Sequence, residues 1–312
     1  SSSAASDVYK RQDMKRTLIA LMACLAAFVN VQAQLLWKVT GNDLAKPSYI
    51  MGTYHLANTS FANSVKGLHD ALNACEQVYG ELNMSQLDTQ AMQGMQSTMM
   101  LPKGQTLDSL LTADQLARLN AFMTKLLGAD LSNPFLEPMK QMTPAALNTQ
   151  FQVLMCMKLE EGFNPNEQFD TYFQNEAKKQ NKAVGGLETL DYQMKVLFSA
   201  PMPRQIEQLM CLVDNYDYQT ELLKRTIKAF YAEDMNAIQQ IYEEKLHNTC
   251  DMTPAEENAL IYTRNANWAK ALPNIMSQRS TLVAVGAAHL PGPRGLLQLL
   301  KDAGYTVTPI SK

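Results

Sequence analysis

Two histidines stand three residues after a glycine, one near each end of the sequence. Gly52-Thr53-Tyr54-His55 and Gly286-Ala287-Ala288-His289 each follow a short run of β-forming residues. Because glycine lets the backbone leave a strand sharply or approach a ligand closely, each histidine is expected on a turn at a strand end. An imidazole in that position can ligate a metal or transfer a proton. The alternative for both is a buried structural histidine.

Two carboxylates occupy equivalent positions. Glu81 closes the apolar run 77–82, and Glu188 closes the run 183–188. Ligands of open α/β sheets bind beyond the carboxyl ends of the strands. If the four strands are parallel neighbours, both histidines and both glutamates lie on one edge of the sheet. We therefore predict a single site from segments far apart in the sequence.

The pattern of apolar residues predicts strands at both ends of the chain and helices between them. Strands are expected at 35–39 and 48–51, which can form a hairpin, and at 77–82, 183–188, 281–285 and 305–308. Helical spacing covers 61–74, 112–158, 203–231, 235–246 and 295–301. Thr112, Thr143 and Thr253 are predicted N-caps, and Gly128 a C-cap. The fold class is α/β, with a mixed sheet covered by a large helical middle section.

The first 33 residues have the composition of a leader rather than of a folded domain. Met14 begins a basic segment, the apolar run 18–29 follows, and Ala33 ends a cleavage site of small residues. We predict residues 1–33 to be a non-native leader plus a signal peptide, and the mature protein to be exported to the periplasm or beyond. The less favoured alternative is a lipoprotein anchored at Cys24.

Residues 34–312 are predicted to form one domain with a helical insertion at about 91–165. Acidic and basic residues are mixed throughout with a net charge of −3, so nucleic acid is excluded as a partner. No apolar stretch of the mature chain is long enough to span a membrane. In an oxidising compartment the remaining cysteines can form two disulfides in three possible pairings, or stay as buried thiols. These cysteines are Cys75, Cys156, Cys211 and Cys250.

Several short motifs together resemble the TraB/GumN family, over nearly the whole mature chain. They are Met51 to His55, the Glu81 strand, Gly186-Leu187-Glu188-Thr189 with Gln193, Arg264-Asn265, and Val285 to Leu290 with Gly292 and Gly295. That family is similar to the Tiki metalloproteases and, more distantly, to erythromycin esterases and haem-binding ChaN-like proteins. The resemblance implies an erythromycin-esterase/ChaN-like fold that is shared more widely than any one activity.

The resemblance also implies a divalent-metal hydrolase acting on a peptide or small-molecule substrate, with manganese or cobalt suggested and zinc possible. Two imidazoles and one carboxylate suit such a metal, so His55, His289 and Glu81 are the predicted ligands. Glu188 is the predicted general base, although the two glutamates can exchange roles. Arg264 is expected to stabilise an oxyanion or to bind a substrate carboxylate. Its alternative is an ion-paired or surface arginine.

Two other functions are compatible with the same residues. In one, a histidine activates water without a metal and the glutamates orient it. In the other, the cleft binds haem or another ligand without turnover, with His55 as an axial ligand. His69 and His247 are predicted outside the site, and the many methionines are expected to fill gaps in helix packing.

Overall fold

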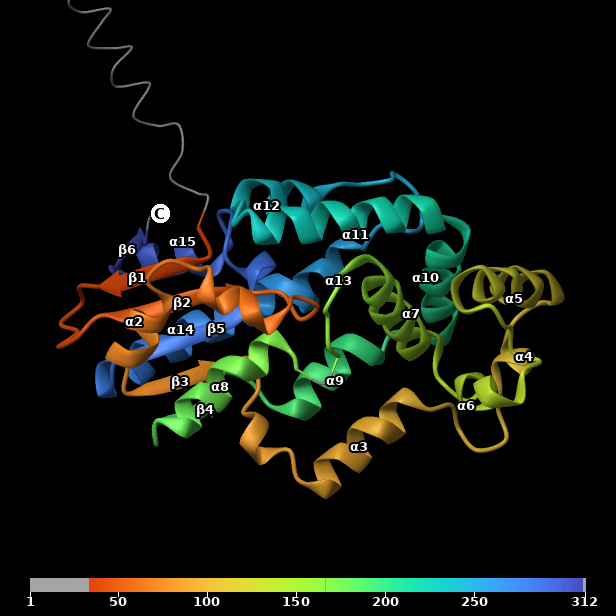
Figure 1. Cartoon of the computed structure of the whole chain (residues 1–312), viewed down its shortest axis with the longest axis horizontal. Helices are drawn as coiled ribbons and strands as arrows, with labels where there is room; N and C mark the ends of the chain where they lie inside the picture. Colours follow the sequence, from red (N-terminus) through yellow and green to blue (C-terminus); the bar gives the residue numbers. More distant parts are fainter. Residues whose placement is uncertain (1–33, 166, 311–312) are drawn as a thin grey trace, which may run out of the picture.

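The computed structural model describes residues 34–165 and 167–310 (Figure 1). The predicted signal segment, its cleavage after Ala33 and the lipoprotein alternative at Cys24 lie outside these residues. Among the residues that are described, no helix is both long enough and apolar enough to cross a membrane.

Six strands form one mixed sheet, which confirms the predicted α/β class. Their order is β4-β3-β5-β2-β1-β6. The strands are β1 (Leu36–Thr40), β2 (Ser48–Thr53), β3 (Gln77–Gly80), β4 (Ala183–Gly186), β5 (Thr281–Gly286) and β6 (Thr306–Pro309). The predicted hairpin is present as the antiparallel pair of β1 and β2, and β6 is also antiparallel to β1. Strands β2, β3, β4 and β5 run parallel to one another.

Strand β5, from the C-terminal part of the chain, lies at the centre of the sheet between two strands from its N-terminal part. It pairs with β2 on one side and with β3 on the other, so that Gly52 lies opposite Val285, and Gly80 opposite Ala284. The first five of its six residues are buried, although successive side chains point to opposite faces. Both faces of β5 are therefore covered, as its continuous apolar run predicts. The parallel arrangement places the ends of β2, β3, β4 and β5 at one edge.

Helices and connecting loops make up the rest of the described chain, and several helices lie at the predicted positions. The α-helices are α2 (Leu68–Ala74), α3 (Thr89–Met99), α4 (Leu107–Leu110), α5 (Ala113–Leu127), α6 (Glu137–Lys140), α7 (Pro144–Leu159), α8 (Phe169–Lys179), α9 (Leu190–Phe198), α10 (Met202–Asp214), α11 (Tyr216–Tyr231), α12 (Met235–Glu243), α13 (Pro254–Glu257), α14 (Thr263–Gln278) and α15 (Leu296–Asp302). The shorter turns are η1 (Thr59–Asn63), η2 (Met84–Gln86), η3 (Pro134–Leu136), η4 (Asn258–Tyr262) and η5 (Ala287–His289).

The predicted N-caps at Thr112, Thr143 and Thr253 are confirmed, because each side chain accepts a hydrogen bond from the backbone three residues on. Gly128 ends α5 in the left-handed conformation that glycine tolerates, at φ +78°.

Other predicted boundaries are confirmed in part and wrong in part. Within the helical stretch 112–158, α5 ends at Gly128 and α7 begins after Thr143 as predicted, with η3 and α6 between them, but the stretch 203–231 breaks at Asn215. His247 lies in a loop beyond α12 rather than at a helix end.

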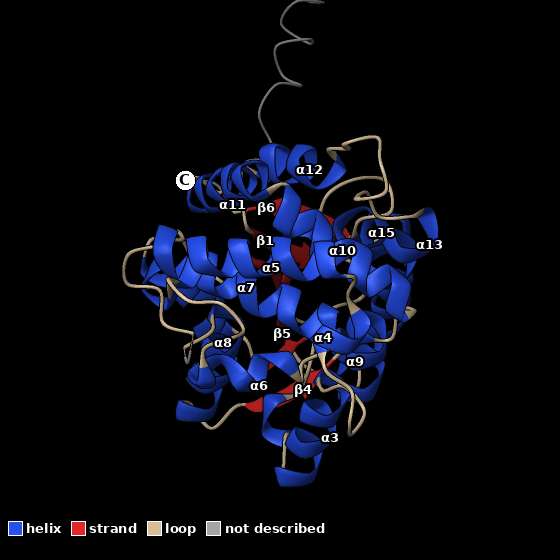
Figure 2. Cartoon of the chain, turned by 90° about the vertical axis from the view of Figure 1, so that its right-hand side faces the viewer, coloured by secondary structure: helices blue, strands red, loops and turns tan. Residues whose placement is uncertain are grey.

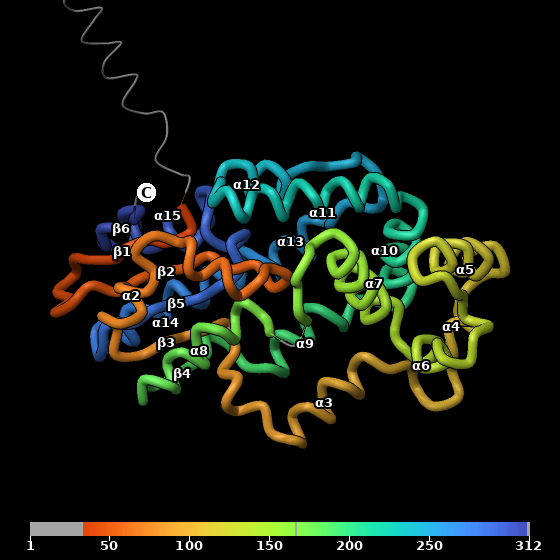
Figure 3. Tube along the Cα trace, in the orientation of Figure 1, coloured from red at the N-terminus to blue at the C-terminus, as the bar shows by residue number. Residues whose placement is uncertain are grey.

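Two large hydrophobic cores lie among the described residues, one in each half of the molecule. The strands lie at the left in Figure 3 and helices α4, α5, α7 and α10 toward the right, the side that faces the viewer in Figure 2. The first lies around the strands and includes buried residues of α2, α8, α11, α12, α14 and α15; we call this part the sheet half. The second lies among α4, α5, α7 and α10, which we call the helical half. A third, small cluster joins Met194 and Phe198 of α9 to Ala146 of α7, with Met95 and Leu190 among the residues packed against it.

Cys211 and Cys250 form a disulfide between α10 and the loop before α13, while Cys75 and Cys156 are buried free thiols. The prediction of a single domain with an insertion at 91–165 stays a prediction.

Candidate active site

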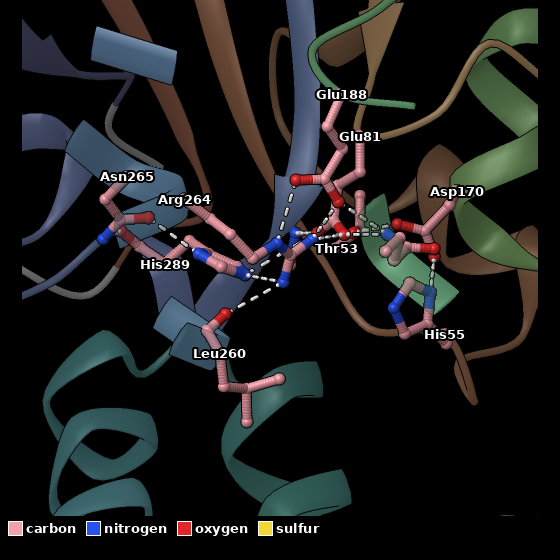
Figure 4. Close-up of polar contacts among 11 residues, drawn as sticks. Thr53, His55, Glu81, Asp170, Glu188, Leu260, Arg264, Asn265 and His289 are labelled. Atoms are coloured by element: carbon pink, nitrogen blue, oxygen red, sulfur yellow. Dashed lines mark hydrogen bonds and ion pairs between the residues drawn. The ribbon is translucent and has the colours of Figure 1, made fainter. Parts of the chain in front are cut away.

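Arg264 lies at the centre of a buried polar network at the carboxyl edge of the parallel strands (Figure 4). Its Nε donates to Glu188 Oε2, and its Nη2 donates to Glu81 Oε2 at 2.5 Å and to Glu188 Oε1 at 2.7 Å. Its Nη1 donates to the Leu260 carbonyl and to His289 Nε2, at 3.0 and 3.1 Å. A guanidinium has five N–H bonds. All five therefore have acceptors within the protein.

A local change of helix geometry places one of these acceptors. Between α13 and α14 the chain forms a π-helical turn, η4, in which the Thr263 N–H bonds to the Asn258 carbonyl. Such turns recur at functional sites because they disturb the regular pairing of the helix. Here the Leu260 carbonyl of the turn accepts from the Arg264 side chain.

The two glutamates follow β3 and β4, and both accept hydrogen bonds from Arg264 and Gln193. Gln193 Nε2 donates to both Glu81 Oε2 and Glu188 Oε1 at 3.0 Å, and the Gly286 N–H donates to Glu81 Oε1 at 2.9 Å. Burial alone would raise the pKa of Glu81, but the neighbouring imidazoles, Arg264 and the Gly286 amide lower it to about 2. Glu81 is therefore a carboxylate at neutral pH.

His289 is buried and held in one tautomer. Its Nδ1 lies 2.7 Å from the amide oxygen of Asn265, whose Nδ2 donates back to the His289 carbonyl. Because that amide oxygen only accepts, Nδ1 carries the proton and Nε2 is left to accept from Arg264. The centroid of the Trp268 ring lies 4.5 Å from the centroid of the His289 imidazole. Burial lowers the pKa of His289 to about 3, so this ring is neutral at pH 7.

His55 lies apart from this network and beside a carboxylate that the sequence did not reveal. Its Nδ1 lies 2.5 Å from Asp170 Oδ2, and Thr53 donates its hydroxyl to the other oxygen of Asp170. The His55 side chain is 60% exposed, whereas those of Glu81, Glu188, Arg264 and His289 are 8% exposed or less. The Asp170 carboxylate, through its charge and its hydrogen bond, raises the pKa of His55 to about 9.

His55 and the network meet at one pocket of about 310 Å³. His55, Glu81, Asp170 and Gln193 contribute to its polar side, while Glu188, Arg264 and His289 are behind the surface. The residues that line the pocket are His55, Gly80, Glu81, Leu82, Met84, Leu87, Met92, Met95, Gln168, Asp170, Thr171, Gln174, Leu190, Gln193 and Met194. The polar side of the pocket therefore consists of the His55–Asp170 pair and of Glu81 and Gln193, which belong to the buried network.

The five predicted site residues gather at one sheet edge, but in two groups. Glu81, Glu188, Arg264 and His289 contact one another, and His55 contacts Asp170 instead. Asp170 was missed because an acidic residue in the first turn of a helix is common and carries no further signal. Gln193 and Asn265 belong to the motifs of the family resemblance, without a role being assigned to them.

The predicted metal ligands do not fit a metal in this arrangement. Glu81 Oε1 and His289 Nε2 are 3.9 Å apart, yet the Arg264 guanidinium lies against both residues and its Nη1 uses the His289 Nε2 lone pair. His55 uses its Nδ1 for Asp170. Within residues 34–165 and 167–310, no group of three His, Cys, Asp or Glu side chains is placed to hold one ion.

Sequence comparisons link the chain to known proteins. It is 26% identical to Metalloprotease TIKI2 of Xenopus tropicalis, over 87% of this chain and 59% of that protein. It is 25% identical to Metalloprotease TIKI1 of the same organism, over 88% of this chain and 62% of that protein. The chain thus spans about three-fifths of the length of these curated relatives. No solved structure matches it. The model of the TraB/PrgY/gumN family matches residues 35–309, so the chain belongs to this family.

Proposed function

We propose that the chain is a hydrolase that cleaves peptide bonds, with His55 activating the attacking water. The observation that carries the proposal is the pair of His55 and Asp170 at the pocket. Nδ1 of the exposed imidazole is bonded to a carboxylate, which leaves Nε2 to exchange a proton with a molecule in the pocket. A base that is oriented by a third group is a recurring element of hydrolytic sites. The peptide as substrate is supported by the similarity to proteins named metalloproteases.

Because Asp170 raises the pKa of His55 to about 9, the neutral imidazole is the minor form at pH 7, and activity is expected to rise as the pH increases toward 9. In this proposal the neutral imidazole takes a proton from water at Nε2 while the water oxygen attacks the substrate carbonyl. The same nitrogen then returns the proton to the leaving amine, so that water is added across the broken bond. Asp170 keeps the proton on Nδ1 and stabilises the imidazolium that forms. This assigns the role of base to His55 rather than to Glu188, whose two oxygens both accept from Arg264.

Arg264 is a positioning residue in this proposal. All five of its N–H bonds are used, so binding a substrate oxygen would require it to release a protein acceptor. It pairs with both buried glutamates and thereby fixes the strand ends that carry Glu81 and Glu188. A buried ion pair with fully satisfied hydrogen bonds holds such a geometry well.

The test uses purified protein and a defined pool of peptides, with cleavage followed by mass spectrometry. His55→Ala is expected to lower kcat/KM at least about 100-fold, the usual contribution of a general base. His69→Ala is the matched control, because His69 is also exposed and does not line the pocket. Full activity in His55→Ala, or no cleavage of any peptide by the unmodified protein, would overturn the proposal.

A second candidate is a metal-dependent hydrolase, as predicted from the sequence. The names of the similar proteins support it, but His289 and Glu81 would first have to exchange Arg264 for an ion. The two candidates differ in a simple measurement. Under our first proposal activity survives exhaustive chelation, whereas loss of activity with recovery on adding Mn²⁺ or Co²⁺ would favour the second and support the ligand set His55, Glu81 and His289.

We also propose that the protein acts outside the cytoplasm. The Cys211–Cys250 disulfide supports this, because disulfides persist in oxidising compartments. Amino-terminal sequencing of the protein from a producing cell is expected to start at Gln34. A start at a lipidated Cys24 would instead support the lipoprotein alternative.

A further inference from the structure

The pocket beside His55 has a second, apolar wall that the proposed chemistry does not use. It is formed by side chains from η2, α3 and α9 and by Leu87, which lies between η2 and α3. These residues are Met84, Leu87, Met92, Met95, Leu190 and Met194. Four of the six are methionines, and they line the same cavity as His55, Glu81 and Asp170. The apolar wall is therefore continuous with the site at which we propose hydrolysis.

The main part of this wall, helix α3, is poorly covered by the protein itself. It extends along the lower edge of the molecule between the sheet half and the helical half (Figure 1). It contains no buried residue, and its principal contact is with α9. Met92 is 45% exposed and also lines the cavity, so much of this apolar side chain is uncovered beside the site. Met95, Leu190 and Met194 of the wall belong to or pack against the third, small cluster, whereas Met92 belongs to none of the three clusters.

Methionine suits a surface that binds apolar groups of varied shape. Its side chain is unbranched and polarizable, and it adapts to a ligand at small energetic cost. Gap-filling, which we expected from the sequence, describes Met123, Met155 and Met210 in the core of the helical half. It does not describe Met92, which faces a cavity and solvent rather than other core side chains.

We propose that this wall is a specificity pocket for one large apolar side chain of a peptide substrate, such as Leu, Met or Phe, next to the bond that is cleaved. The proposal rests on the proposed function of the same site. A cavity of about 310 Å³ is at the lower end of the range for small-molecule sites and suits a single residue. Gln168, Gln174 and Gln193 also line it, and such polar groups suit a flanking peptide unit better than a bare hydrocarbon chain.

The first experiment measures binding without requiring turnover. Protein labelled with ¹³C at the methionine methyl groups is titrated with N-acetyl-leucinamide, N-acetyl-serinamide and dodecanoic acid, with each signal assigned by substitution. Saturable shifts of Met92, Met95 and Met194 are expected with the leucine compound alone. Met157 is the internal control, since it is 47% exposed on α7 and does not line the pocket. Equal shifts with serinamide, tighter binding of dodecanoic acid, or no saturable shift would overturn the proposal.

The second experiment measures selectivity among peptides that the unmodified protein cleaves. Met95→Gln is expected to lower kcat/KM for peptides with Leu beside the cleaved bond about tenfold relative to peptides with Ser there, the usual scale for one apolar contact. Met157→Gln is expected to leave this ratio unchanged. An unaltered ratio in both Met95→Gln and Met92→Gln would overturn the specificity pocket while leaving hydrolysis intact.

The two experiments separate the two proposals. If no peptide is cleaved but the leucine compound shifts the pocket methionines, the hydrolase proposal fails and the apolar pocket stands. If peptides are cleaved without preference for an apolar residue, the reverse holds.

Discussion

The sheet half and the helical half differ in the kinds of side chain that they bury. The sheet half contains buried ionisable side chains, Glu81, Arg264 and His289, at the edge of its core. The core of the helical half consists of apolar residues, mainly leucines, methionines and aromatic residues. The ion pairs on its helices are exposed, as for Arg118 with Asp214, or partly exposed, as for Arg204 with Glu207.

Buried charge is costly unless it is paired and hydrogen-bonded. Among the described residues, the buried charged side chains lie in the sheet half. They are therefore held in fixed positions there, at a cost in folding free energy. Between the two halves, α9 and the adjoining α3 supply most of the apolar wall of the pocket. The following predictions test this contrast, from the largest expected effect to the smallest.

Removing the charge of Arg264 is expected to have the largest effect. Arg264→Met leaves two buried carboxylates and the His289 nitrogen without their partner, and breaking a buried pair on one side costs about 3–5 kcal/mol of folding free energy. The matched change Arg118→Met removes an exposed pair and is expected to cost less than about 1 kcal/mol. Urea denaturation measures both. Equal losses would show that the two halves do not differ in this way.

Leu119→Ala tests whether the two cores unfold together. Leu119 is fully buried in α5, and truncating such a leucine costs about 2–5 kcal/mol. The chain has two tryptophans, Trp37 and Trp268, and both belong to the core of the sheet half. We expect the transition followed by far-ultraviolet circular dichroism to shift more than the transition followed by tryptophan fluorescence. Coincident shifts would mean that the halves form one cooperative unit.

The smallest expected effect concerns the exposed pair of His55 and Asp170. A ring titration of the four histidines by NMR is expected to give His55 a pKa well above 6.5, and Asp170→Asn is expected to lower it. Because the folded-state pKa is raised, the pair stabilises the protein fully below pH 6.5, and this contribution is lost as the pH rises through about 9. A pKa of His55 that Asp170→Asn leaves unchanged would contradict the contact.

The sequence predicted the sheet better than the site. Glycine and β-forming residues mark the ends of β2, β3, β4 and β5 locally, so the positions of His55, Glu81, Glu188 and His289 on these ends followed from short segments. Their gathering at one edge followed from parallel pairing, which the uninterrupted apolar run of β5 indicated.

The contacts within the site could not be predicted in the same way. Which side chain lies between Glu81 and His289 depends on where α14 packs, and no local pattern specifies that. The sequence therefore suggested a metal where Arg264 supplies the positive charge. Asp170 lies 115 positions from its partner His55, and nothing near it in the sequence marks that contact.

The central position of β5 also has a consequence for the order of folding. β2 and β3 are separated in the sheet by a strand that is synthesised more than 200 residues later, since the Thr53 and Gly286 positions pair across 233 residues. Until β5 arrives, both earlier strands expose unpaired edges, which favour association with other chains. The helices of the helical half, α4, α5, α7 and α10, all precede β5 in the sequence, so this half can form before β5 is available. We therefore expect the sheet, and with it the pocket, to be completed only after β5 has been synthesised.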